Sequence, residues 1–385
     1  MTARRVAVFL LLMGLMACLG VLPCAAQNGD ADAFTSLPPE YEDMLRSLPE
    51  AIRSSLPENV LSSDPGEVAS AIEQFLTPAS LLRYLVELLF SDVSVPLSLL
   101  LGVCGVLVLR AVMDCMAAGL GGGMSEGFSL LCRLCFCLLL VRHALSVLQQ
   151  VRVFFDALRQ LTLSYLPLMS AMYLSGGNVA VATVNQSTVI FSNALVSLLG
   201  GESVVPMVAF CLSLMALGTV DGSLGARMSH ISGKIKKWYT TALALTMLLL
   251  GSVLAAQTTL AARADSLAFK TVRFVVSSNI PFVGGGVAEM MRSAATGILW
   301  LRSLVGIGGV LMLLALLLPT LCRVLLCRLV CTLGADVAAW LGCGEEGRLL
   351  GEIGGLYGYL IAIVSLSCMT FFFSLILLLQ CATAF

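Results

Sequence analysis

The sequence predicts an all-α, polytopic membrane protein with about six to eight transmembrane helices, some of them broken by glycine and proline. The chain has 385 residues, of which 58% are apolar, and its mean hydropathy is +0.97. Only 12% of the residues are charged, against roughly 25% in a soluble domain. These values exclude an ordinary cytosolic enzyme, a disordered chain and a coiled coil. The net charge of −1 argues against a nucleic-acid-binding protein.

Residues 1–26 have the pattern of a secretory signal peptide. Two arginines, Arg4 and Arg5, precede an apolar run over residues 6–22, and small residues follow up to Ala26. This run is short for a membrane span, so we expect cleavage near Ala26. A retained first helix is the alternative.

Residues 27–80 form an acidic segment that the signal peptide would deliver outside the cytoplasm. It contains many aspartates and glutamates, and its only basic residues are Arg46 and Arg53. The apolar residues Met44, Leu48 and Ile52 recur at helical spacing between prolines, which predicts short amphipathic helices. A partner-docking role and a solvated spacer are both open interpretations of this extracytoplasmic segment.

Residues 81–385 form the predicted membrane domain. Each of its long apolar stretches approaches or reaches the roughly 20 residues that a bilayer core demands. These stretches are 95–113, 128–148, 160–176, 179–199, 205–222, 239–261, 303–321 and 355–380.

Charge predicts the orientation of the membrane domain. The densest basic loop is expected in the cytoplasm; it contains Arg227, Lys234, Lys236 and Lys237. Counting the predicted spans back from this loop places the acidic segment outside, as the signal peptide requires. The same scheme puts a loop with Arg142, Arg152 and Arg159 outside, which conflicts with the positive-inside rule.

Two regions depart from plain lipid-facing helix. The first contains Gly176, Gly177 and Asn178, followed by Asn185, Gln186 and Asn193. The second contains Asn279, Pro281, Gly284, Gly285 and Gly286, followed by Glu289 and Arg292. Backbone groups freed by a helix break cannot face lipid, so these regions are expected against protein or along a watery cavity.

The polar residues of these regions have alternative interpretations. Asn185, Gln186 and Asn193 are expected either to line a pathway or to join helices by hydrogen bonds. Glu289 and Arg292 share a helix face, as a functional pair inside the membrane or as a surface bridge at its edge. A second glycine group follows each region, at Gly200–Gly201 and at Gly306–Gly309, and such paired breaks are typical of transporter repeats.

No catalytic, cofactor or metal site is predicted. His143 and His230 stand apart from any nucleophile pattern, and no phosphate-binding loop occurs. Nearly every one of the 14 cysteines lies in an apolar run, where cysteine is a small helix residue. The function classes that stay open are a channel, an export scaffold and a permease.

The carboxy-terminal half resembles the stage III sporulation protein AE family. The specific stretch is KTVRFVVSSNIPFVGG over residues 270–285, supported by Lys236–Trp238, Val305–Gly308 and Glu352–Gly354. The order of signal peptide, acidic segment and membrane body also matches. The resemblance covers roughly residues 80–385.

This resemblance implies a multi-pass protein in the mother-cell membrane around the engulfed forespore. It further implies a role in a secretion-like channel that joins the two cells and supports late forespore development. The partners implied are membrane and ring-forming products of the same sporulation operon and a forespore membrane protein, together with the lipid bilayer. A stand-alone secondary transporter and a non-conducting membrane scaffold are the alternatives.

Overall fold

The structure is a computed structural model of the chain. It describes residues 39–53, 93–117, 122–175, 179–220, parts of 227–256, residues 284–380 and a few isolated positions between 70 and 87. In the last long segment, side chains are described from Leu304 to Leu375, apart from those of Thr370 and Phe373. The predicted signal peptide, residues 1–26, lies outside the described part of the chain.

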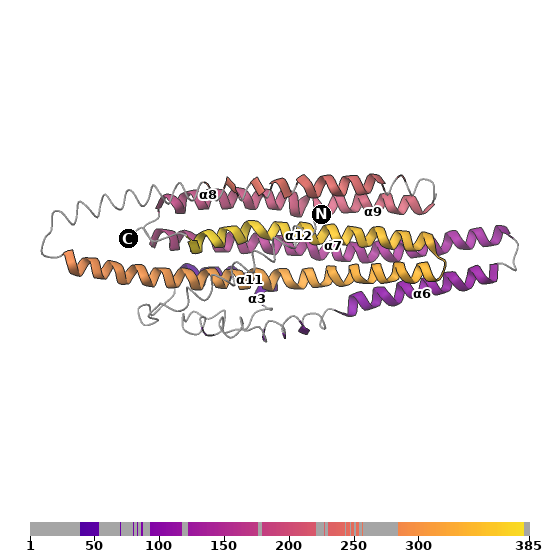
Figure 1. Ribbon diagram of the computed structural model, residues 1–385, viewed down its shortest axis with the longest axis horizontal. Helices are drawn as coiled ribbons and strands as arrows, with labels where there is room; N and C mark the ends of the chain where they lie inside the picture. The colour runs from indigo at the N-terminus through magenta and orange to yellow at the C-terminus, as the bar shows by residue number, and fades with distance from the viewer. Residues whose placement is uncertain are drawn as a thin grey trace.

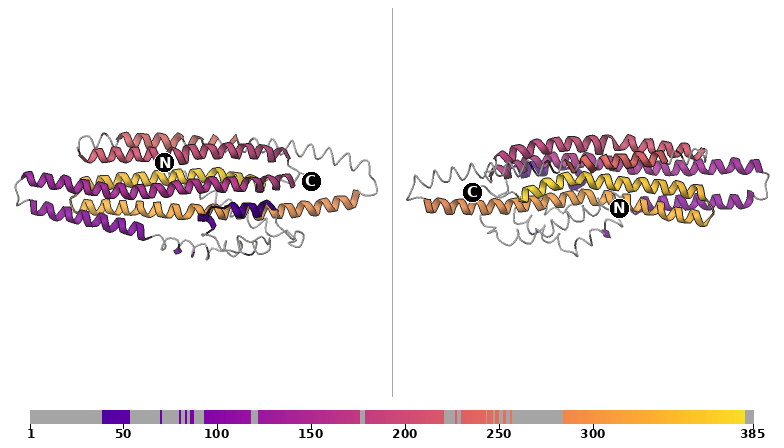
Figure 2. Two further views of the ribbon diagram at one scale, coloured as in Figure 1. Left: turned by 180° about the vertical axis from the view of Figure 1, so that it is seen from behind. Right: turned by 45° about the horizontal axis from the view of Figure 1, so that its top comes forward.

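Four long helices form the central bundle: α6 (Ser94–Ala117), α7 (Gly122–Ser175), α11 (Gly284–Trp340) and α12 (Gly344–Gln380). They lie side by side along the long axis of the molecule (Figures 1 and 2). α11 packs along α12, and α6 packs against both α7 and α11. Within the described residues all regular structure is helical, which confirms the predicted all-α class.

A second group of helices lies against α7. It consists of α8 (Val179–Val196), the π-helix η3 (Ser197–Glu202) and α9 (Val204–Val220). Residues 230–242 are also helical, and they run back beside α9 in Figure 1.

The acidic segment contains the two short helices α2 (Pro39–Ser47) and α3 (Glu50–Arg53). α2 packs on α7, and α3 contacts α11. The apolar face predicted from the sequence is buried, since Met44 and Ile52 are 1% and 0% exposed. Residues 39–53 are therefore part of the folded body, and the short helices predicted for the acidic segment are confirmed over this described stretch.

Five helices within the described residues are long and apolar enough to cross a membrane. They are Ser94–Met116, Leu130–Ser175, Val179–Val196, Leu304–Trp340 and Gly344–Met369; α9 holds a shorter apolar helix, Val204–Ala216. The polytopic membrane class is thus confirmed. The predicted span over 239–261 lies partly outside the described residues.

The predicted boundary between spans 128–148 and 160–176 is wrong. Both belong to α7, which is continuous over 54 residues. The charged stretch between them, with Arg152, Asp156 and Arg159, is an exposed face of the helix. The charged residues there lower the local hydropathy as a loop between two spans would. No glycine or proline stands between residues 142 and 160 to interrupt the backbone hydrogen bonds of the helix. Pro167 lies inside the same helix without ending it.

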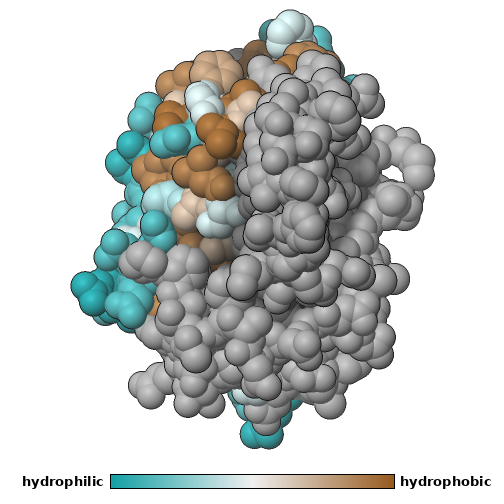
Figure 3. Space-filling view, turned by 90° about the vertical axis from the view of Figure 1, so that its left-hand side faces the viewer, coloured by the Kyte–Doolittle hydropathy of each residue, from teal (hydrophilic) through white to brown (hydrophobic). Residues whose placement is uncertain are grey.

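The long helices exceed the thickness of a bilayer. At a rise of 1.5 Å per residue, the 54 residues of α7 and the 57 residues of α11 extend about 81 Å and 86 Å. A hydrocarbon core is only about 30 Å thick. Each of these helices therefore has a large part outside the hydrocarbon. Seen from the end where α11 begins, hydrophobic side chains border hydrophilic ones on the described surface (Figure 3).

Candidate functional site: a polar seam and an ion cluster

The inner face of α8 carries polar side chains. Asn185 and Asn193 are 0% and 8% exposed, and Thr188 and Ser192 on the same face are buried too. Gln186 points the other way and is exposed, because neighbouring helix residues lie about 100° apart. The structure therefore brings Asn185 and Asn193 together on one face and separates Gln186 from them.

A small pocket opens where α8 meets α7 and α12. It encloses about 280 Å³ of empty space, part of it open to the surface. Its polar side chains come from three helices: Thr162, Ser192, Asn193, Ser367 and Ser374. We call these five residues together with Asn185 and Thr188 the polar seam.

Most hydroxyl groups of the polar seam are satisfied within their own helices. Thr162 donates to the carbonyl oxygen of Leu158 at 2.8 Å, and Ser367 donates to that of Ile363 at 2.9 Å. Ser374 instead donates across the bundle to the Met169 sulfur at 3.6 Å. The protons of these hydroxyl groups thus need no further acceptor. The hydroxyl oxygens can still accept hydrogen bonds from a polar ligand.

Asn185 differs from the rest of the polar seam. Neither its amide nitrogen nor its amide oxygen has a hydrogen-bond partner among the described residues. A buried polar group without a partner costs about 1–3 kcal/mol. Such a group in a described site requires an explanation, and a role in binding or conduction is one.

The predicted helix breaks have mixed outcomes. Gly176, Gly177, Asn178, Asn279 and Pro281 lie outside the described residues. Gly284, Gly285 and Gly286 form the first turn of α11, and Glu289 and Arg292 follow on that helix; their side chains are not among those described. Gly200 and Gly201 lie in η3, where a π-helix interrupts the regular α pattern.

The second glycine group of the carboxy-terminal half, Gly306–Gly309, does not break its helix. These glycines lie inside the continuous helix α11. A Cβ atom built on Gly309 would lie 2.7 Å from Leu375 Cδ2 and 2.9 Å from the Tyr165 hydroxyl oxygen. The glycines therefore allow close packing of three helices, as small residues do in membrane bundles. The faint repeat of glycine groups in the two halves is not matched by a repeat of structure, since one group is π-helical and the other α-helical.

The predicted cytoplasmic basic loop is helical from residue 230 onward. Arg227, Lys234 and Lys237 are exposed, but Lys236 is only 5% exposed. Burial lowers the pKa of Lys236, while Cys211 on α9 and Glu352 on α12 act in the opposite direction. Lys236 is thus an internal group, because helical spacing turns it toward the bundle.

An ion cluster that the sequence analysis missed joins α6, α7 and α12. The Arg110 Nε atom lies 3.0 Å from Asp114 Oδ2 and 3.9 Å from Glu346 Oε1. Arg133 Nε lies 3.9 Å from the same Glu346 oxygen. The side chains of Arg110 and Glu346 are 11% and 5% exposed. The signal was available, since Arg110 and Asp114 stand four residues apart within an apolar stretch.

The acidic segment is tied to α7 by polar contacts as well as by its apolar face. The carbonyl oxygen of Ser47, at the end of α2, accepts hydrogen bonds from Gln160 Nε2 at 2.9 Å and from Ser164 Oγ at 3.4 Å. Burial raises the pKa of Tyr41 on α2 to about 12. Exposed carboxylates, among them Glu42, Asp43 and Glu50, cover the outer side. Because carboxylates need water, the outer side of residues 39–53 suits contact with water and not with lipid.

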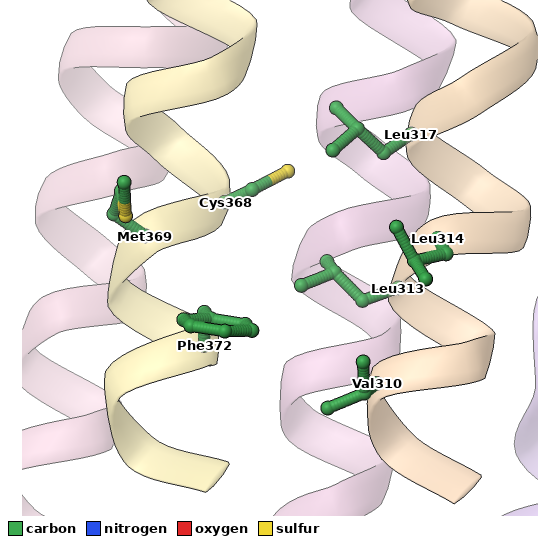
Figure 4. A pocket seen from close by; sticks show the side chains of 7 residues that line it. All are labelled: Val310, Leu313, Leu314, Leu317, Cys368, Met369 and Phe372. Atoms are coloured by element: carbon green, nitrogen blue, oxygen red, sulfur yellow. The ribbon is translucent and has the colours of Figure 1, made fainter. Parts of the chain in front are cut away.

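A second pocket lies between α11 and α12 and is apolar. It encloses about 350 Å³ of empty space, again including open surface. In Figure 4, Cys368 and Phe372 of α12 point toward Leu313 and Leu317 of α11. Val310, Leu314 and Met369 complete the lining. It offers no charged group to a solute. Among the described residues, no group of three or more His, Cys, Asp or Glu side chains gathers as a metal site would require.

Comparison with known proteins points to one family. A curated protein from Bacillus subtilis (strain 168), stage III sporulation protein AE, is 24% identical over 213 residues, which is 55% of this chain and 53% of that protein. The alignment thus spans about half the length of this relative. No solved structure matches the chain. The model of the stage III sporulation protein AE family matches residues 67–382, nearly the whole membrane body, and the chain therefore belongs to this sporulation family.

Proposed function

We propose that this chain is an integral, non-catalytic component of a secretion-like channel between mother cell and forespore, needed for late forespore development. The observation that carries the proposal is the family match over residues 67–382, which covers the helices of membrane-spanning length. The proposed location is the mother-cell membrane around the forespore, with the cleaved amino terminus and the acidic segment outside the cytoplasm. The proposed partners are products of the same operon, including ring-forming proteins, and a forespore membrane protein.

Within this proposal, the polar seam is the part of the protein that contacts the transported material or lines the path of ions. Support comes from its composition, with hydroxyl and amide groups of α7, α8 and α12 around one opening. The unpartnered amide of Asn185 adds a group that is able to bind. Apolar helices pack well without such groups, so their presence at a helix junction is costly unless it is used.

The test is a deletion of the gene in sporulating cells of the source organism. A late forespore transcription reporter is followed after engulfment, and the deletion is complemented with variants. We expect engulfment without reporter activity in the deletion, and recovery with the wild type. Normal reporter activity in the deletion would reject the channel proposal and favour the stand-alone secondary transporter.

Two variants separate the polar seam from the outer face of α8. The first replaces both Asn185 and Asn193 by leucine, and the second replaces the exposed Gln186 by leucine. If the seam works as proposed, the first variant reaches the membrane at the normal level yet fails to restore the reporter, while the second restores it. A first variant that restores the reporter would assign the seam to packing. Loss of its membrane assembly would favour the scaffold interpretation.

A further inference from the structure

Arg142 and Asp336 are charged residues that face outward on helices of membrane-spanning length. Arg142 on α7 and Asp336 on α11 are both exposed, and neither makes an ion pair or hydrogen bond with the described residues. Three other charged residues, Arg110, Arg133 and Glu346, differ from these two because they form ion pairs with one another between the helices.

Close contacts between helices show the depth of the two residues. A Cβ on Gly102 of α6 would lie 3.3 Å from Leu139 of α7, so these residues are level. A Cβ on Gly334 of α11 would lie 3.0 Å from Val103 of α6, which makes that pair level as well. α6 and α11 run in the same direction and α7 runs against them (Figure 1).

Counting from these contacts places Asp336 level with residue 105 of α6 and Arg142 level with residue 99. Residue 105 is the middle of the apolar span Ser94–Met116 of α6, and Asp336 lies four residues before the end of its own apolar span, Leu304–Trp340. The side of α6 exposed at this level is apolar, since Leu101, Val108 and Val112 are 66%, 52% and 49% exposed. An outward carboxylate level with the apolar face of a neighbouring span is costly unless it meets protein or water.

The surroundings of each charge suit a neighbouring helix. Asp336 follows a row of exposed leucines on α11: Leu325, Leu329 and Leu333. Arg142 lies in a similar exposed row on α7: Leu131, Leu134, Leu138 and Leu145. The two rows cover overlapping depths, so they match when two molecules stand side by side in one membrane.

We propose that Asp336 of one molecule pairs with Arg142 of a second copy of this chain, in a contact between α11 and α7. Copies with the same orientation keep each residue at its own depth, and the two residues differ by roughly 9 Å along the axis, six residues at 1.5 Å each. Side chains tilt toward the amino terminus of their helix. Since α7 and α11 run in opposite directions, the two side chains tilt toward each other and close this difference.

The pairing explains why both charges persist in apolar rows. Each is costly alone in lipid, whereas together they neutralise each other and fix the register of the leucine rows. The contact uses different surfaces of the two molecules. Contacts of this kind close into rings when the rotation between copies allows it.

The experiment uses two full-length copies with different tags, co-expressed and recovered from the membrane in mild detergent. We expect wild-type copies to co-purify. Asp336→Arg in both copies places arginine against Arg142, and Arg142→Asp in both places aspartate against Asp336. Each should lower co-purification at least about tenfold.

The decisive arm mixes the two variants. When one copy carries Asp336→Arg and the other Arg142→Asp, every contact between unlike copies again joins opposite charges, so co-purification should return to near the wild-type level. Arg152→Asp in both copies is the matched control, because Arg152 is an exposed arginine of α7 beyond the span of α6. That control should leave co-purification unchanged.

Several outcomes would overturn the proposal: wild-type copies that do not co-purify, reversals without effect, or a mixture as weak as the single variants. If a reversal prevents membrane insertion, Asp336→Asn and Arg142→Gln replace it. Each neutral variant should weaken co-purification, whereas the mixture of the two should recover in part, because Asp336 of one copy can still pair with Arg142 of the other. Unchanged co-purification in the neutral variants would reject the pairing.

Discussion

The hydroxyl group of Tyr165 on α7 donates a hydrogen bond to the backbone carbonyl oxygen of Val305 on α11. A helix carbonyl is normally covered by the side chains three and four residues later, but here these positions are Gly308 and Gly309. The glycines thus uncover the carbonyl for Tyr165, which is 0% exposed. The ring of Tyr165 also packs edge-on against Phe371 of α12, with centroids 5.6 Å apart. One tyrosine joins three helices.

Gly309→Ala should destabilise the bundle by about 1–3 kcal/mol, the usual effect of overpacking. Its new methyl group would lie 2.7 Å from Leu375 and 2.9 Å from Tyr165. Thermal unfolding in detergent is the measurement. Gly308→Ala is the control, because its methyl group would lie 3.7 Å from Tyr165, an ordinary contact. Since alanine favours helix by about 1 kcal/mol over glycine, that variant should be equal to wild type or more stable. Equal losses in both variants would show that this packing does not matter.

Glu346→Gln should destabilise the protein by about 3 kcal/mol, because it leaves the buried Arg110 and the half-buried Arg133 without their shared carboxylate. Glu345→Gln is the neighbouring control. Glu345 pairs with Arg348 at 3.8 Å, and its side chain is 46% exposed, so the loss should stay below about 1 kcal/mol. Chemical unfolding of the two variants gives the comparison. Equal stabilities would mean that the ion cluster does not hold the helices.

Lys236→Glu should prevent stable folding or insertion, whereas Lys237→Glu on the exposed side should be tolerated. The buried site would then hold a new carboxylate near Glu352. The amount of protein recovered from the membrane is the measure. A similar recovery of both variants would contradict the inward position of Lys236.

The same lysine predicts a pH dependence. Because burial lowers the pKa of Lys236 in the folded state from 10.5, the unfolded state binds more protons between the lowered value and 10.5. Stability should therefore rise with pH across this window and level off above it. Lys236→Met lacks this group, so its unfolding temperature should gain less over the same pH range. A gain equal to that of wild type would assign the effect to other residues.

Ile52→Asp should release the acidic segment from the bundle. Ile52 is 0% exposed, and a carboxylate there would lose its water without gaining a partner. Hydrogen exchange of residues 39–53 should accelerate by about tenfold or more, while the core of α12 stays protected. Glu50→Gln, an exposed change in the same short helix, is the control and should leave exchange as in wild type.

The spacing of apolar residues predicted the helices correctly where a single buried face sets that spacing. Met44, Leu48 and Ile52 recur at helical spacing and are all buried in the structure. The same reasoning failed in α7, where the charges between residues 142 and 159 suggested a loop. Hydropathy measures the cost of lipid contact, and a helix that extends beyond the bilayer shows the same drop in hydropathy as a helix that ends.

The polar residues of α8 illustrate what a local pattern leaves open. The sequence singled out Asn185, Gln186 and Asn193 together, and the structure buries two of them and exposes Gln186. The hydroxyl residues that line the pocket beside Asn193, namely Thr162, Ser367 and Ser374, come from α7 and α12. Single serines and threonines are common in membrane helices, so nothing in their own surroundings marked them.

The sequence by itself determined the all-helical membrane class, the amphipathic acidic segment and the family. These follow from composition, from the period of the apolar residues and from a distinctive stretch of residues, all of which are local properties of the chain. The tertiary structure decided which helices continue, which lysine faces inward, and how Arg110, Arg133 and Glu346 meet. The reason is physical: the cost of a charge or of a glycine depends on what packs against it, and those neighbours are far away in the sequence.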